Sequence, residues 1–126
     1  MLKPVETTKA PAAVGPYSQA VLSNGQIYCS GMLPINPENG EITATTVEEQ
    51  TKQVMENIIG LLKEVDLSLD DVVKTTIFLD SIESFQQVNE VYDHYFSNHK
   101  PARSCVEVAA IPKGALVEIE FIAQLN

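Results

Sequence analysis

Two stretches of the chain place apolar residues three and four positions apart, which is the spacing of an amphipathic α-helix. The first stripe consists of Val54, Met55, Ile58, Leu61, Leu62 and Val65. Thr46 and Glu49 precede it with the spacing of a capping box, so the helix is expected to begin after Thr46. The second stripe consists of Phe85, Val88, Val91, Tyr92, Tyr95 and Phe96. It stops before Pro101, because the residue that precedes a proline disfavours the α conformation.

Segments that are rich in β-branched residues, or that alternate apolar and polar residues, predict strands. These segments are residues 17–22, 26–32, 72–79, 103–110 and 116–124. Asn24-Gly25 joins the first two segments, and this dipeptide favours a type I′ hairpin turn. With that turn, Gln19 opposes Ser30. Tyr17 then opposes Met32, and all four side chains are expected to point to one side of the sheet.

Strand segments therefore lie toward both ends of the chain, with two helices between them and a proline-containing loop at residues 33–45. This order predicts one α+β domain over residues 1–126, with a mixed, mostly antiparallel sheet and two helices packed on one face. The other face would lie in water unless a partner subunit covers it, and an apolar sheet face is unfavourable there. The pattern thus predicts an oligomer.

Composition narrows the class of protein. A length of 126 residues is within the roughly 100 to 200 residues of one domain, and no apolar run approaches the ~18 residues of a membrane span. The first residues lack the apolar stretch of a signal peptide, so we expect a cytoplasmic protein with no membrane partner. Cys29 and Cys105 form no CxxC pair and are expected to be reduced thiols. A net charge of −9 repels phosphate backbones and disfavours nucleic acid as a partner.

Arg103 and Cys105 have the same parity in one predicted strand, so their side chains share a face. Taken alone, this arginine is more typical of a surface ion pair than of an active site. Cys105 could be a nucleophile, but His94 and His99 lie at the end of the second helix and not on a neighbouring strand. A packing role or a pocket wall suits Cys105 better. The two histidines also lack a recognised spacing for metal ligands.

Glu118 and Glu120 share a face of the last predicted strand with Leu116 and Ile122. Carboxylates between apolar residues are partly desolvated, which raises the pKa toward the range that is useful for proton transfer. Glutamates on an edge strand that deter aggregation would give the same pattern. The residues alone leave both interpretations open.

Several motifs together resemble the RidA (YjgF/YER057c/UK114) family over nearly the whole chain. They are GPYSQA at residues 15–20, CSG at 29–31, VKTT at 73–76, PARSCVEV at 101–108, IPKG at 111–114 and VEIE at 117–120. Two positions depart from the family pattern. Asp66 stands where relatives often have glycine, and residues 97–100 are a shorter segment than in many relatives.

The resemblance implies a chorismate mutase-like homotrimer with three sites in the clefts between subunits. It also implies a cytoplasmic hydrolase of metabolite damage control. Such a deaminase hydrolyses reactive 2-imino acids, the products of PLP-dependent dehydratases, to 2-keto acids and ammonia without a metal or an organic cofactor. Two alternatives stay open. One is a ligand-binding or chaperone-like regulatory module in the same clefts, because family membership alone does not guarantee catalysis. The other is the ribonuclease activity of some relatives.

The family motifs also imply roles for individual residues. Arg103 would grip the substrate carboxylate through two parallel hydrogen bonds, and Glu118 would activate the attacking water. Glu120 is given no such role. The residues expected to line the pocket are Tyr17, Ser30, Gly31, Asn89, Arg103 and the backbone of Cys105.

Overall fold

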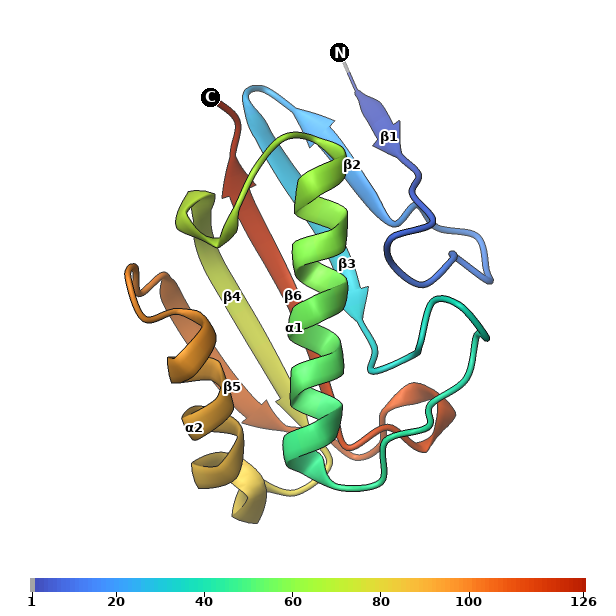
Figure 1. Ribbon diagram of the computed structural model, residues 1–126, viewed down its shortest axis with the longest axis vertical. Coiled ribbons are helices and arrows are strands. Elements are labelled where there is room, and N and C mark those ends of the chain that lie inside the picture. Colours follow the sequence, from blue (N-terminus) through green and yellow to red (C-terminus); the bar gives the residue numbers. More distant parts are fainter. Residues whose placement is uncertain (1) are drawn as a thin grey trace.

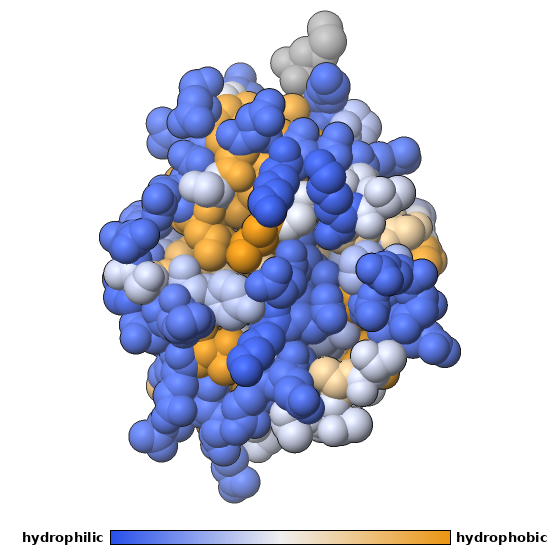
Figure 2. Space-filling view, in the orientation of Figure 1, coloured by the Kyte–Doolittle hydropathy of each residue, from blue (hydrophilic) through white to orange (hydrophobic). Residues whose placement is uncertain are grey.

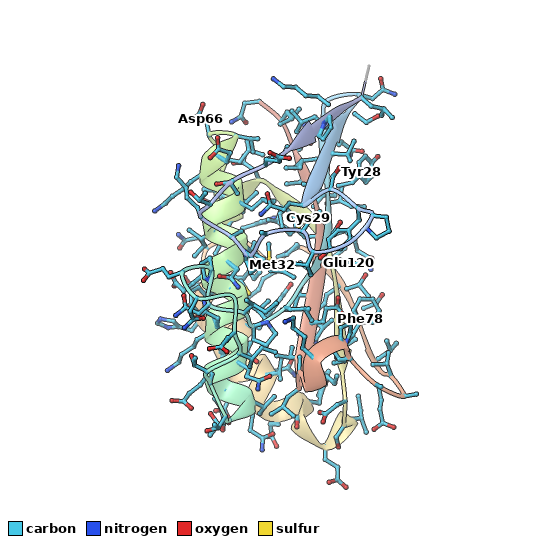
Figure 3. The ribbon with its side chains drawn as sticks, turned by 90° about the vertical axis from the view of Figure 1, so that its right-hand side faces the viewer. Tyr28, Cys29, Met32, Asp66, Phe78 and Glu120 are labelled. Carbon is cyan, nitrogen blue, oxygen red and sulfur yellow. The ribbon has the colours of Figure 1, made fainter. Side chains whose placement is uncertain are left out.

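A six-stranded mixed sheet carries both α-helices on one of its faces (Figures 1 and 3). The computed structural model describes residues 2–126. Its strands are β1 (Lys3–Val5), β2 (Ala20–Ser23), β3 (Gln26–Met32), β4 (Val72–Leu79), β5 (Ala102–Glu107) and β6 (Val117–Gln124). Its helices are α1 (Val47–Glu64) and α2 (Phe85–Tyr95), with short 3-10 turns η1 (Leu69–Asp71), η2 (Ile82–Ser84) and η3 (Pro112–Gly114).

The strand order is β1-β2-β3-β6-β4-β5. β4 pairs in parallel with β5, and the other pairings between these strands are antiparallel. The predicted mostly antiparallel sheet with two helices on one face is therefore confirmed. No helix within residues 2–126 is long and apolar enough to cross a membrane.

Both helices form where the apolar stripes predict them. The Thr46 hydroxyl accepts a hydrogen bond from the Glu49 amide at 3.2 Å and caps α1. The apolar stripe of α1 is buried against the sheet, with Val54 and Leu61 0% exposed. Asp66, after α1, has a φ of 59°, the left-handed conformation that asparagine and aspartate tolerate better than most residues. The exposed side of α1 is hydrophilic (Figure 2).

The β2–β3 hairpin has the predicted turn and register. Asn24 and Gly25 both have positive φ angles, 49° and 77°, as a type I′ turn requires. Ser30 donates its amide proton to the Gln19 carbonyl at 3.0 Å. The predicted start of the first strand at Tyr17 is wrong, because the Tyr17 amide bonds the Gly15 carbonyl at 2.9 Å in a tight turn. The expected pairing of Tyr17 with Met32 is therefore also wrong.

A bulge interrupts the pairing of β3 with β6. Cys29 pairs with Phe121 and Met32 with Ile119, so Ser30 and Gly31 together oppose the single residue between these two partners. The extra residue turns Met32 to the helix side, where it is buried like Cys29 (Figure 3). The expectation that Ser30 and Met32 point the same way is wrong for this reason, since alternation holds only along an uninterrupted strand.

The face without helices mixes apolar and acidic side chains. Tyr28 and Phe78 point to this face, away from α1, together with Glu120 (Figure 3). Tyr28 is 45% exposed and Val106 is 44% exposed. Neither helix of residues 2–126 lies over this face, which we call the open face. Along the last two strands the boundaries also differ from the sequence, because β5 ends at Glu107 and not Ala110, and β6 begins at Val117 and not Leu116.

Candidate functional site

A cavity of about 540 Å³ opens beside the β3 bulge, and Glu118 is its acidic residue. Its lining is otherwise mainly apolar. The lining residues are Pro11, Ala12, Val14, Tyr17, Gln19, Ser30, Gly31, Met32, Leu33, Ile35, Pro112, Lys113 and Glu118. We call it the Glu118 cavity. It contains four of the residues that the sequence motifs selected, and these four are Tyr17, Ser30, Gly31 and Glu118.

The Glu118 carboxylate lies directly against the backbone of Gly31. A Cβ atom added to Gly31 would overlap a carboxylate oxygen of Glu118 and would lie 2.8 Å from its Cδ atom. Glycine is therefore required at position 31 because any side chain there would collide with Glu118. A positive φ angle is not the reason, since Gly31 does not have one. The bulge and the glycine together leave the space in which Glu118 lies.

The environment of Glu118 favours the neutral acid. Burial raises the pKa of this half-buried carboxyl, and the charge of Glu120, further along β6, raises it again. Neither cause is offset by a basic partner, since no ion pair joins Glu118 to the residues that the structure describes. The expected desolvation of Glu118 is confirmed. The rise brings the pKa of this carboxyl closer to the range that is useful for proton transfer.

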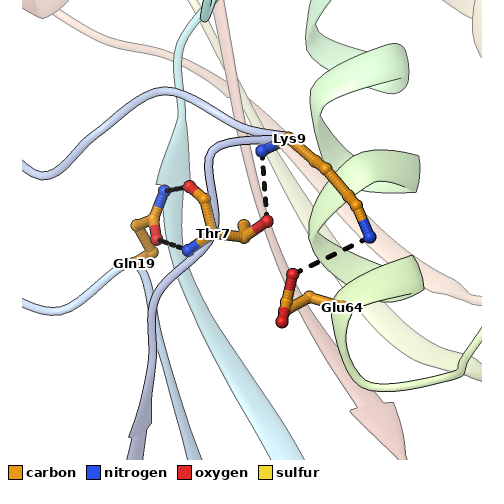
Figure 4. Close-up of polar contacts among 4 residues, drawn as sticks. All are labelled: Thr7, Lys9, Gln19 and Glu64. Carbon is orange, nitrogen blue, oxygen red and sulfur yellow. Dashed lines mark hydrogen bonds and ion pairs between the residues drawn. The ribbon is translucent and has the colours of Figure 1, made fainter.

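Gln19 holds the outer wall of the cavity in place, a role that the sequence did not reveal. Its side chain exchanges two hydrogen bonds with the backbone of Thr7, at 2.7 Å and 3.0 Å (Figure 4). It also donates to the Pro11 carbonyl at 2.7 Å. Lys9, two residues after Thr7, lies 3.8 Å from Glu64 of α1. The N-terminal segment thereby contacts both the residue that precedes β2 and helix α1. The Gln19 side chain is 7% exposed, and this burial of a polar amide is what indicates its role. The sequence alone does not reveal that burial.

Arg103 occupies a second site, on the helix side of β5. Its Nη1 atom donates to Asn89 Oδ1 at 2.6 Å, and its Cζ atom lies 5.5 Å from the ring centre of Phe85 and 5.2 Å from that of Tyr92. A groove of about 390 Å³ adjoins the guanidinium. The groove, which we call the Arg103 groove, is lined by Asn89, Tyr92, Asp93, Lys100, Pro101 and Arg103.

Arg103 is the cation of this groove that can bind a ligand. Lys100 is already paired, since its ammonium lies 2.5 Å from Asp93 and donates to the Phe96 carbonyl at 2.8 Å. Arg103 makes one hydrogen bond to residues 2–126 and no ion pair among them. Its side chain is exposed, so its other N–H groups can meet a carboxylate in the fork geometry that guanidinium favours.

Cys105 follows Arg103 on the same side of β5 and is only partly buried. Burial raises the pKa of its thiol, and the Arg103 charge opposes that rise with a smaller effect. The thiol is therefore neutral at physiological pH and a weak nucleophile. Cys29 is buried, and burial raises the pKa of its thiol far above the usual range. Both cysteines are free thiols, as expected.

The predicted residues therefore fall into two groups on opposite faces of the sheet. Arg103 aligns with Thr75, which is buried beneath α2, whereas Glu118 aligns with Phe78 on the open face. Within one chain the structure brings Arg103 together with Asn89, and Glu118 together with Gly31, but it does not bring Arg103 to Glu118. Two residues beside Arg103 that sequence reasoning did not select are Phe85 and Tyr92, whose spacing marked them only as core residues.

Sequence comparisons identify relatives over almost the full length. The family model described as Endoribonuclease L-PSP matches residues 7–125. AldR of Lactococcus lactis, which is named as a candidate regulator, is 49% identical over 125 residues that cover 99% of each chain. The human 2-iminobutanoate/2-iminopropanoate deaminase is 44% identical over 119 residues, covering 94% of this chain and 87% of the human protein.

The solved structures agree with the fold. The crystal structure of E. coli TdcF with bound serine superposes with a TM-score of 0.93 at 38% identity, covering 98% of this chain and 99% of that chain. That relative therefore holds a small amino acid on the same fold.

Proposed function

Because the chain belongs to the endoribonuclease L-PSP (YjgF/RidA) family, we propose that it hydrolyses 2-imino acids to 2-keto acids and ammonia. The human relative bears the name of this activity for 2-iminobutanoate and 2-iminopropanoate. These imines are the products of PLP-dependent dehydratases, so the role would be the removal of a reactive intermediate. A cytoplasmic location suits that role.

The observation that carries the proposal is the Glu118 carboxyl in its mainly apolar cavity. Hydrolysis of an imine needs a group that takes a proton from water and returns one to the leaving nitrogen. A carboxyl whose pKa is raised by burial is closer to the working pH than an ordinary surface glutamate is. Glu118 is therefore the acid and base of the proposed reaction.

Arg103 supplies the binding of the substrate. A 2-imino acid carries a planar carboxylate next to its C=N bond, and a guanidinium can bind it through two parallel charge-assisted hydrogen bonds. Asn89 holds one side of Arg103 at 2.6 Å, which leaves the other N–H groups for this contact. The substrate is thus fixed at the end that does not react.

The reaction balances with water as the only co-substrate. Glu118 accepts a proton from water as the oxygen bonds to the imine carbon, and the C=N bond becomes a single bond. Starting from the protonated imine, this step gives a neutral carbinolamine. Glu118 then returns its proton to the nitrogen and the C–N bond breaks. The C=O bond of the keto acid forms as the hydroxyl proton passes to the departing ammonia, which leaves as ammonium. Holding water and imine together supplies much of the acceleration, because an iminium carbon is already electrophilic.

A second copy of the chain completes the site in this proposal. The substrate is too small to contact Arg103 on the helix side of β5 and Glu118 on the open face of the same chain. Tyr28 and Val106, 45% and 44% exposed, give the open face an apolar surface that another subunit would cover favourably. We propose a homotrimer in which Arg103 of one subunit and Glu118 of the next share a cleft.

The activity can be tested by coupling the protein to a threonine dehydratase. Semicarbazide competes for the free imine, and the appearance of 2-ketobutyrate is recorded with and without the protein. We expect the protein to accelerate 2-ketobutyrate formation and to lower the yield of the semicarbazone. No acceleration by the wild type would exclude the enzymatic function, and an Arg103→Ala variant as active as the wild type would exclude the clamp.

A ligand-binding regulator is the second candidate function. The candidate-regulator name of AldR and the serine bound to TdcF both favour it. It predicts binding of keto acids that depends on Arg103, with no turnover in the coupled assay. The family description also names an endoribonuclease, but a net charge of −9 is unfavourable for binding RNA. RNA cleavage that survives purification and disappears in Glu118→Gln would support that activity.

A further inference from the structure

Three side chains on one side of α2 hold the guanidinium of Arg103. Phe85, Asn89 and Tyr92 are spaced by four and three residues, so they form a continuous stripe along the helix. The guanidinium carbon lies within 5.5 Å of both ring centres, and the Asn89 amide between them accepts its hydrogen bond. These distances are those of cation–π contacts.

Tyr92 is itself fixed from below by Thr75. The two hydroxyl oxygens lie 2.6 Å apart, and the residues are 6% and 1% exposed. Burial raises the pKa of the Tyr92 phenol, and the hydrogen bond to Thr75 and the charge of Arg103 lower it by less. Phe96 packs against the same ring, with 4.7 Å between ring centres. Thr75 is also the residue that aligns with Arg103 across the β4–β5 pairing, so one short chain of contacts joins Thr75, Tyr92 and Arg103.

We propose that Tyr92, anchored by Thr75, is a positioning residue that fixes the plane of the Arg103 guanidinium for a planar carboxylate ligand. This inference rests on the proposed function, in which Arg103 binds the substrate carboxylate. An arginine side chain that is free in solution loses many rotamers on binding, and one that is already ordered avoids that loss. The phenol acts only through Arg103, since its hydroxyl faces Thr75 in the core.

Two variants break the contact chain at different points, and two others serve as matched controls. Tyr92→Phe removes the hydroxyl and keeps the ring over Arg103, and Thr75→Val removes the partner hydroxyl. Thr75→Ser keeps that hydroxyl and is expected to behave as the wild type. Tyr95→Phe is the control, because Tyr95 lies on the same helix and donates its hydroxyl to Glu56 at 2.8 Å, with no ring contact to Arg103.

Steady-state kinetics separate positioning from packing. We expect the KM for the imine to rise about three- to fivefold in Tyr92→Phe and Thr75→Val, with kcat nearly unchanged, since the clamp binds substrate and transition state alike. Tyr95→Phe and Thr75→Ser are expected to keep the wild-type KM. A merely structural role would lower Tm and leave KM as it is.

The side-chain Nε–Hε resonance of Arg103, measured by NMR without any ligand, gives a second readout. We expect a shift caused by the aromatic rings and an ordered side chain in the wild type, and we expect both to diminish in Tyr92→Phe and Thr75→Val. Unchanged resonances and an unchanged KM in both variants would overturn the proposal. A changed resonance in a protein whose wild type neither binds a 2-keto acid nor hydrolyses the imine would support the positioning and refute the proposed function.

Discussion

Arg103 and Glu118 lie on opposite faces of one sheet, although β4 alone separates their strands. Arg103 aligns with Thr75 of β4, whose side chain is buried beneath α2. Glu118 aligns with Phe78 of the same strand, which faces away from the helices (Figure 3). Under the proposed function, a small substrate that needs both residues therefore lies between two copies of the chain.

The fork geometry of Arg103 is expected to matter more than its charge. Arg103→Lys keeps a cation but loses the two parallel N–H groups that match a carboxylate. We expect kcat/KM and the affinity for 2-ketobutyrate to fall about 10- to 100-fold, the range of hydrogen bonds to charged groups. Coupled kinetics and calorimetric titration measure the two quantities.

The control for this change is Lys100→Met, which removes the other cation of the Arg103 groove. Lys100 is paired with Asp93 at 2.5 Å, so we expect its loss to alter keto-acid affinity by less than about threefold. If Arg103→Lys binds as tightly as the wild type while Lys100→Met weakens binding, a general positive charge and not the fork binds the carboxylate.

The two glutamates of β6 are expected to respond differently to the same substitution. Glu118→Gln removes the proton acceptor inside the cavity, and we expect kcat to fall at least about 100-fold. Glu120→Gln is the matched control, because Glu120 is an exposed residue on the same face of the strand, and we expect kcat within about threefold of the wild type. Equal losses in the two variants would argue against a specific role for Glu118.

The pH profile is expected to report the environment of Glu118. The base must be ionised, so activity falls as the pH drops through the pKa of Glu118. Because burial and the charge of Glu120 raise that pKa, the acid limb of kcat/KM is expected above the usual range of a glutamate. Glu120→Gln removes the second cause, and the limb is then expected to move to lower pH. A limb that stays in place would show that another group titrates.

The contact between Gly31 and Glu118 predicts an unusual effect of a single methyl group. In Gly31→Ala the new Cβ atom displaces the carboxylate, which is the flexible end of a side chain and can move away. We expect kcat to fall at least about tenfold while Tm changes by no more than about 4 °C, the shift that roughly 1 kcal/mol produces. Kinetics and calorimetry on the same sample test this. Wild-type kcat in Gly31→Ala would contradict the assigned position of Glu118.

Much of the fold follows from local patterns in the sequence. The apolar stripes predicted both helices, because apolar residues that recur about every 3.6 positions share one side only in an α-helix. Residues 72–79 were predicted as a strand and form β4, and Asn24-Gly25 set the hairpin register. Tyr17 was misplaced, because Gly15-Pro16 forms a tight turn that delays the start of β2 until Ala20.

The relation between the two halves of the site was not predictable in the same way. Parity tells which residues of one strand share a face, and it placed Arg103 with Cys105 and Glu118 with Glu120 correctly. It does not tell how faces correspond between strands, which depends on the parallel pairing of β5 with β4 and on the place of β6 within the sheet. The bulge at Ser30 and Gly31 was not predicted either. A bulge adds one residue to a strand, and in a segment as short as β3 the alternation of apolar and polar residues is too brief to show where that residue lies.

Mixing two inactive variants tests most directly whether two subunits form one site. Arg103→Ala and Glu118→Gln chains are purified separately, shown to be inactive alone, then unfolded together in equal amounts and refolded. If one subunit supplies Arg103 and its neighbour supplies Glu118, random assembly gives each cleft both native residues in about a quarter of cases. We expect the mixture to recover about a quarter of the activity of refolded wild type. A mixture that stays as inactive as its components would contradict a site shared between subunits.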